Sequence, residues 1–210
     1  MKILSATALA ILIFAFTSCK SNGTKDEHAG HDMGNMIIDT TQHTTVSADI
    51  EIKAVTVLYS NLDVKVTTSV KEIIDHYLHV KNALANDNAK EAAIGSKAME
   101  AALGKIDKSI LTAEQKLAYD KMEGGLKETS SSIARSGDNI KQQRVQFVAM
   151  SEAVYQLVKN FGAGRPIYHV HCPMARDNQG AMWISEIREV KNPYFGSAMP
   201  ACGTVEEVIK

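Results

Sequence analysis

The stretch SVKEIIDHYL, residues 69–78, sets the period of the sequence that follows it. Ser69 and Glu72 have the spacing of a capping box, in which a hydroxyl and a carboxylate satisfy free backbone amides at the start of a helix. From Val70 onward, apolar side chains recur at intervals of three and four residues, which is typical of one face of an α-helix. The stretch therefore predicts a helix that begins near residue 69 and buries one face.

Three more amphipathic stretches follow, and short polar turns separate them. The second covers about residues 89–106, the third begins with the capping box Thr112–Gln115, and the fourth covers about residues 138–161. Each apolar stripe is buried only if it packs against the other helices. We therefore expect a mainly α fold for residues 69–210: an antiparallel four-helix bundle with a C-terminal tail of loops and short strands that carries a Cys/Met site. In this tail, residues 167–171 and 181–185 are expected to be short strands with turn residues between them, and residues 205–208 are expected to form a helical turn.

Residues 49–68 precede the first helix and differ from it in pattern. Apolar and polar residues alternate in Ile50–Lys53 and again in Leu62–Thr67, with Ser60-Asn61 between them. Alternation with period two is typical of strands, and a polar pair can turn the chain. This segment is predicted to be a hairpin or an extended lead-in.

The first 18 residues are typical of an export signal. Lys2 precedes an apolar run, residues 3–16, that is too short to remain as a membrane-spanning helix. The run ends with small residues and then Cys19, which is the pattern of a bacterial lipoprotein signal peptide. We expect Cys19 to be lipidated, so that the protein is anchored to a bacterial membrane in the cell envelope and faces the periplasm or the surface.

Residues 19–48 are predicted to be a disordered tether, because they are polar and poor in apolar side chains. Two histidines and two methionines lie at short spacing within this tether. Short His/Met-rich tracts bind metal ions without a folded support. The candidate residues for auxiliary metal capture are His28, His31, Met33 and Met36.

Soft metal donors gather in the C-terminal tail, residues 168–203. Thiolates and thioethers suit Cu(I) and Ag(I) better than Mg²⁺ or Ca²⁺. Pro173 stiffens the turn between one cysteine and one methionine, and Gly203 removes bulk beside the other cysteine. The predicted metal ligands are Cys172, Met174, Met199 and Cys202, with His171 and Met182 as second choices.

A disulfide is the alternative for the two thiols. If Cys19 is lipidated, Cys172 and Cys202 are the remaining pair, and exported proteins fold where disulfides form. Their bridge would close a loop of about thirty residues and stabilise the fold by about 3–4 kcal/mol. The protein would then be a disulfide-stapled interaction module without metal, with Asn192–Gly196 as its contact surface. The neighbouring methionines favour the metal hypothesis, because a structural disulfide does not need them.

The chain from about Val70 to Val208 resembles a family of bacterial exported domains of unknown function. The family occurs as lipoproteins and as a C-terminal appendage of adaptor subunits in RND-type copper/silver efflux systems. The resemblance implies metal handling or efflux, with such an adaptor as a partner. The matching residues are Tyr77-Leu78, Lys81–Leu84, Gln143-Arg144, Phe147, Ser151, Tyr168, Cys172–Ala175, Gly180–Ser185, Asn192–Gly196, Met199 and Cys202-Gly203.

Other classes of function lack support in the sequence. The formal net charge is −1 and no basic face is evident, so nucleic-acid binding is not expected. His171 is adjacent to Cys172, and on an extended segment the two side chains point opposite ways, which is a poor arrangement for a base and its nucleophile. We expect no enzymatic activity.

Overall fold

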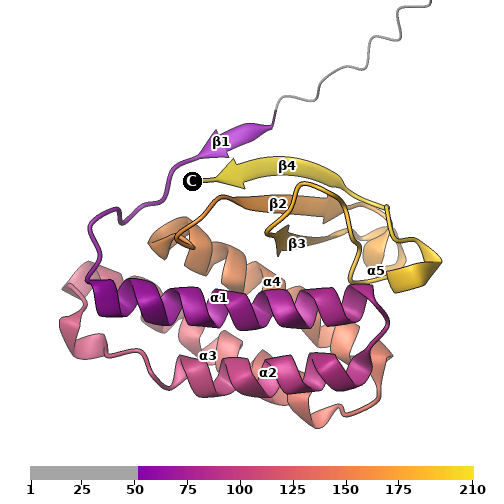
Figure 1. The fold of residues 1–210 in the computed structure, drawn as a ribbon, viewed down its shortest axis with the longest axis horizontal. Coiled ribbons are helices and arrows are strands. Elements are labelled where there is room, and N and C mark those ends of the chain that lie inside the picture. The colour runs from indigo at the N-terminus through magenta and orange to yellow at the C-terminus, as the bar shows by residue number, and fades with distance from the viewer. Residues whose placement is uncertain (1–51) are drawn as a thin grey trace, which may run out of the picture. The chain divides into compact units, whose positions relative to one another are not determined.

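The computed structural model describes residues 52–210, which form a mainly helical fold with a small C-terminal sheet (Figure 1). The predicted signal peptide, Cys19 and the His/Met tether lie outside the described residues. No helix in the described part of the chain is both long and apolar enough to cross a membrane. In chain order, the elements are β1 (Lys53–Val55), α1 (Val64–Ala85), α2 (Ala89–Leu103), η1 (Lys108–Ile110), α3 (Ala113–Arg135), α4 (Ile140–Phe161), β2 (Ile167–Cys172), α5 (Ala175–Asn178), β3 (Ala181–Ser185), η2 (Gly196–Ala198) and β4 (Thr204–Ile209).

Helix α1 begins earlier than the sequence pattern predicted. The hairpin predicted for residues 49–68 is therefore wrong. The helix starts at Val64, where the side chain of Asp63 accepts a hydrogen bond from the amide of Lys65. Ser69 therefore lies inside the helix and caps nothing. Val66 is buried while Val64 is exposed, so the helical stripe extends backwards by one turn. An acidic N-cap, together with this stripe, outweighs the short run of alternating residues.

The remaining helices follow the predicted pattern. The capping box of α3 is confirmed, because Thr112 and Gln115 exchange hydrogen bonds between side chain and backbone. Asn88 and Asn139 cap α2 and α4 in the same manner. Consecutive helices pack against each other, and α1 also contacts α4. The apolar stripes of the four helices thus share one core.

The sheet has the strand order β1-β4-β2-β3. Strands β2 and β3 were predicted, and they pair antiparallel with Cys172 opposite Ala181. Residues 205–208 were expected to form a helical turn, which is wrong, since they belong to β4. This strand pairs with β2 on one side and with β1 on the other. Two ladders of backbone hydrogen bonds satisfy more backbone groups than a single isolated helical turn.

The β3 edge of the sheet docks on the helices, as Figure 1 shows. The free backbone groups along this edge find side-chain partners. The amide of Ile184 donates to the hydroxyl of Tyr77 on α1 at 3.2 Å, and the hydroxyl of Tyr194 donates to the carbonyl of Met182 at 2.6 Å. Unpaired groups on a buried edge would each cost free energy. Tyr77 therefore fixes the sheet, and with it the tail, on the helical layer, while Tyr194 joins the β3–β4 loop to the edge of β3.

Asp87 anchors the long loop between β3 and β4. Its carboxylate accepts a hydrogen bond from the amide of Ser197 at 2.9 Å and one from Arg144 Nη2 at 2.6 Å. Arg144 also donates to the carbonyl of Pro193 at 2.8 Å. The hydrogen bonds from Ser197 and then from Arg144 lower the pKa of Asp87 to about 2.

We predict that Asp87 contributes to stability above about pH 4, and that this contribution is lost as the pH falls towards 2. The folded-state pKa is lower than the ordinary value, so protonation favours the unfolded chain in that range. Because the carboxylate is partly exposed, the effect should be at most about 1 kcal/mol. The test compares the urea unfolding free energy of wild type and Asp87→Asn from pH 2 to pH 6. A difference that does not shrink towards pH 2 would contradict the prediction. Asn tolerates the positive φ of 56° at this position, so the backbone is preserved.

Candidate metal centre

The fold brings Cys172 and Cys202 together. Cys172 ends β2, and the pairing of His171 with Thr204 places the residues before β4 next to it. The neighbouring Cys172 thiol raises the pKa of Cys202, and burial raises it further. The backbone amide of Met174 opposes this rise in the pKa of Cys202. Both thiols are free in the structure.

The two cysteines differ in exposure. Cys172 is completely buried in the core, while Cys202 is partly exposed. An ion would therefore reach the pair from the Cys202 side. A pair of adjacent thiols suits a soft cation, which both sulfurs can bind once they have lost their protons, and it equally suits oxidation to a disulfide.

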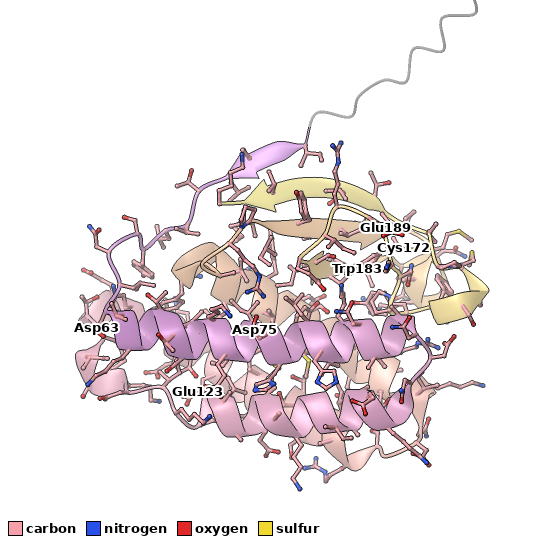
Figure 2. The ribbon with its side chains drawn as sticks, in the orientation of Figure 1. Asp63, Asp75, Glu123, Cys172, Trp183 and Glu189 are labelled. Atoms are coloured by element: carbon pink, nitrogen blue, oxygen red, sulfur yellow. The ribbon has the colours of Figure 1, made fainter. Side chains whose placement is uncertain are left out.

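Trp183 and Gly203 pack together beside the thiols. Trp183 is fully buried on β3, on the same face of the sheet as Cys172, and Figure 2 shows both residues at one end of the sheet. Gly203 has φ of 149°, and a Cβ there would lie 2.8 Å from the Trp183 ring. Gly203 is thus needed for both its backbone conformation and the space it leaves, since any larger residue next to Cys202 would press on the indole.

Asn192 is a supporting residue whose role the sequence did not reveal. It is fully buried, and its Nδ2 donates to the carbonyl of Cys202 at 2.6 Å. Its Oδ1 accepts hydrogen bonds from the amides of Tyr194 and Phe195 at 2.8 Å and 3.1 Å. Asparagine before proline is a common turn signal, but it does not show which backbone group the side chain will reach. In the structure Asn192 fixes the position of Cys202.

The segment Asn192–Gly196 is mostly core. Tyr194 is buried, and its ring lies 5.7 Å from Phe147 and 6.0 Å from Trp183. The segment was predicted as the contact surface of an interaction module. That prediction is wrong for its buried residues, because the aromatic side chain packs inward and the hydroxyl is used at the β3 edge.

The two methionines predicted as metal ligands lie in the turns that flank the thiols. Met174 follows Cys172 by two residues and is 46% exposed. Met199 lies in the turn before Cys202, where its carbonyl accepts a hydrogen bond from the Cys202 amide at 3.4 Å. Both thioethers therefore belong to flexible side chains on short turns beside the thiol pair.

The two residues predicted as second-choice ligands, His171 and Met182, lie elsewhere. His171 precedes Cys172 in β2, and Met182 of β3 pairs directly with His171. Because successive side chains of a strand alternate, both residues project from the face opposite Cys172. His171 instead packs over Gly180, where an added Cβ would lie 2.7 Å from its Nε2. The structure does not bring His171 or Met182 to the thiols.

Within residues 52–210, no three His, Cys, Asp or Glu side chains form a ready metal-binding group. At the thiol pair, further donors would have to come from the methionines. His28, His31, Met33 and Met36 lie outside the described residues, so their distance from this pair is undefined.

Comparison with protein families matches most of the helical part of the chain. The model of DUF3347, described as a protein of unknown function, matches residues 73–165. The chain is thus similar, from α1 to the loop after α4, to a family of domains without an assigned function. The match ends before β2, so it does not include the thiol pair. No curated protein and no solved structure matches the chain.

We predict that Gly203→Val will destabilise the fold by about 1–3 kcal/mol, because the new side chain clashes with Trp183 and strains the backbone. The chain has a single tryptophan, Trp183, so its fluorescence during urea unfolding reports directly on this region. The control is Gly124→Ala in α3, where nothing lies within 4 Å of the added Cβ. That control should stabilise the helix by about 0.5–1 kcal/mol. Equal effects of the two variants would contradict the proposed role of Gly203.

Proposed function

We propose that this protein is an exported, lipid-anchored metal-binding protein that takes up Cu(I) or Ag(I) at its C-terminal tail. The observation that carries the proposal is the placement of two free thiols next to each other, one buried and one partly exposed. Soft sulfur donors select soft monovalent cations over the harder divalent ions of the cell envelope. In this proposal, Cys172 and Cys202 are the main ligands, and Met174 and Met199 complete the coordination.

The arrangement around the thiols supports a binding role. The two cysteines come from segments that are 30 residues apart in the chain, and each is fixed by its own contacts: Cys172 by the β2–β3 pairing and Cys202 by Asn192. The methionines, in contrast, are on turns and can adjust to an ion. In the proposal, the four long helices form an antiparallel bundle that serves as the rigid support for this tail.

The anchor and the tether extend the proposal to the whole chain. Lipidation of Cys19 would hold the protein at a membrane, and His28, His31, Met33 and Met36 would capture ions and pass them to the tail. The family resemblance adds an RND-type efflux adaptor as the receiver of the ion. Metal handling of this kind requires binding and release, and no chemical conversion of a substrate.

We predict that the reduced full-length protein binds one Cu(I) at the tail, in competition with a Cu(I) chelator under anaerobic conditions. The variant Cys172→Ala/Cys202→Ser should bind Cu(I) at least about 100-fold more weakly at this site, since it lacks both thiolate ligands. A second variant, with His28, His31, Met33 and Met36 all replaced by Ala, separates capture by the tether from binding by the tail. This tether variant should retain the tight site.

Thiol titration, combined with the Cu(I) measurement, tests the disulfide alternative. If thiol titration of protein isolated from the cell envelope finds no free thiols at Cys172 and Cys202, and reduction does not produce Cu(I) binding, the protein is a disulfide-stapled module. Equal Cu(I) affinity in wild type and in Cys172→Ala/Cys202→Ser would overturn the tail as the metal site.

A further inference from the structure

The face of the sheet opposite the thiols carries a second group of metal-type donors. His169 and His171 are two residues apart in β2 and therefore share this face. Glu206 of the neighbouring strand β4 lies between them: its Oε2 is 3.3 Å from His169 Nδ1, and its Oε1 is 3.5 Å from His171 Nδ1. A carboxylate thus faces one nitrogen of each of two imidazoles.

A β-bulge produces this arrangement. Val170 pairs with Val205, whereas His169 pairs with Glu207, so Glu206 is the extra residue in β4. An extra residue interrupts the alternation of a strand and redirects its side chain. Without the bulge, Glu206 would be an ordinary residue between Val205 and Glu207. It would then follow the alternation of the strand and would not be inserted between the partners of the two histidines. The bulge is therefore what places its carboxylate between them.

The surrounding contacts fix one side of the group and leave the other free. The ring of His169 packs at 4.6 Å from the ring of Tyr155, whose hydroxyl donates to Glu207 at 2.6 Å. His169 is 12% exposed, whereas His171 and Glu206 are 37% and 47% exposed. His169 is thus held in place, while the other two side chains can move.

His169 Nδ1 lacks a partner. This nitrogen is buried and makes no hydrogen bond, although Glu206 lies close to it. Leaving a buried polar atom unpaired costs about 1–3 kcal/mol, which an ion bound to its lone pair would recover.

The spacing of the donor atoms fits a small transition-metal ion. Ligands about 2.0–2.2 Å from a tetrahedral Zn²⁺ lie about 3.3–3.6 Å from each other. The two nitrogen–oxygen distances, 3.3 Å and 3.5 Å, are in this range. The three side chains do not yet surround one point, as the absence of a ready metal-binding group within residues 52–210 indicates. Rotation of the exposed Glu206 and His171 would bring their donors onto one ion.

We propose that His169, His171 and Glu206 form a site for a divalent transition-metal ion such as Zn²⁺, separate from the thiol pair and on the opposite face of the sheet. Imidazole nitrogen and carboxylate oxygen are borderline and hard donors, and they suit Zn²⁺ or Cu²⁺ rather than Cu(I). The remaining coordination positions face solvent and are open to water. The site does not depend on the Cu(I)/Ag(I) function of the tail.

The test is Zn²⁺ titration by calorimetry on the full-length chain in detergent. All proteins carry His28→Ala and His31→Ala, to exclude the tether, and Cys172→Ala and Cys202→Ser, to exclude the thiols. We expect this background protein to bind one Zn²⁺. Adding His171→Ala/Glu206→Gln, both at partly exposed positions, should weaken binding at least about tenfold, because loss of a ligand costs no less than loss of a supporting partner.

The chain supplies a matched control. His79 and Glu91 form another histidine–carboxylate pair, 2.9 Å apart and 42% and 47% exposed, in which the carboxylate is paired with one imidazole instead of two. His79→Ala/Glu91→Gln should leave Zn²⁺ affinity unchanged. The proposal is overturned if the background protein binds no Zn²⁺, or if the two double variants lose affinity equally.

A second readout covers the case in which the cysteine substitutions prevent folding. Co²⁺ is then added to the chain with intact thiols, where a thiolate-to-cobalt charge-transfer band marks binding at the cysteines. Binding without that band, lost in His171→Ala/Glu206→Gln, supports the proposal, and binding with the band alone overturns it. The same variant with intact thiols should keep wild-type Cu(I) affinity. Failure of the thiol site is thus distinguished from failure of the histidine site.

Discussion

The structure depends on one buried hydroxyl, that of Tyr77. It accepts a hydrogen bond from the amide of Ile184 in β3 and lies 2.9 Å from the hydroxyl of Ser151 in α4. One atom thus joins two helices to the edge of the sheet, and burial raises the pKa of Tyr77 far above its usual range. A β-sheet edge normally pairs with another strand or faces water. Here the Tyr77 hydroxyl accepts a hydrogen bond from the edge of β3 that a neighbouring strand would otherwise accept. The edge of the four-stranded sheet can therefore dock against the helices.

Docking by an edge leaves the sheet with two usable faces. One face carries Cys172 and Trp183 under the β3–β4 loop, and the other carries the two histidines beside Tyr155. Lys81 reinforces the same junction: it is fully buried, yet its ammonium group lies 2.9 Å from Glu186 at the end of β3. Since an unpaired buried charge is costly, this contact also fixes where the long loop begins.

The sequence predicted the local features and missed those that depend on distant partners. The four helices, the Thr112–Gln115 cap and the pairing of β2 with β3 could be predicted because each rests on a local period or turn. The start of α1 was misplaced because Leu62–Thr67 fits both a strand and a helical period, and only packing of Val66 decides between them. Strand β4 was missed because Val205–Val208 gains its structure from β1 and β2, far away in sequence. The proximity of Cys172 and Cys202 was expected from composition alone. In contrast, the bulge at Glu206 and the hydrogen bond from Asn192 follow from strand register, which no local pattern encodes.

The position of β4 in the interior of the sheet has a consequence for biosynthesis. Chains are made from the N-terminus and their early segments can fold first, so the helices can assemble while the tail is still being synthesised. Both candidate sites include residues from the last part of the described chain, Cys202 in one and Glu206 in the other. Neither can close until β4 has inserted between β1 and β2. A chain in which β4 has not yet paired therefore displays single donors, and neither candidate site is complete.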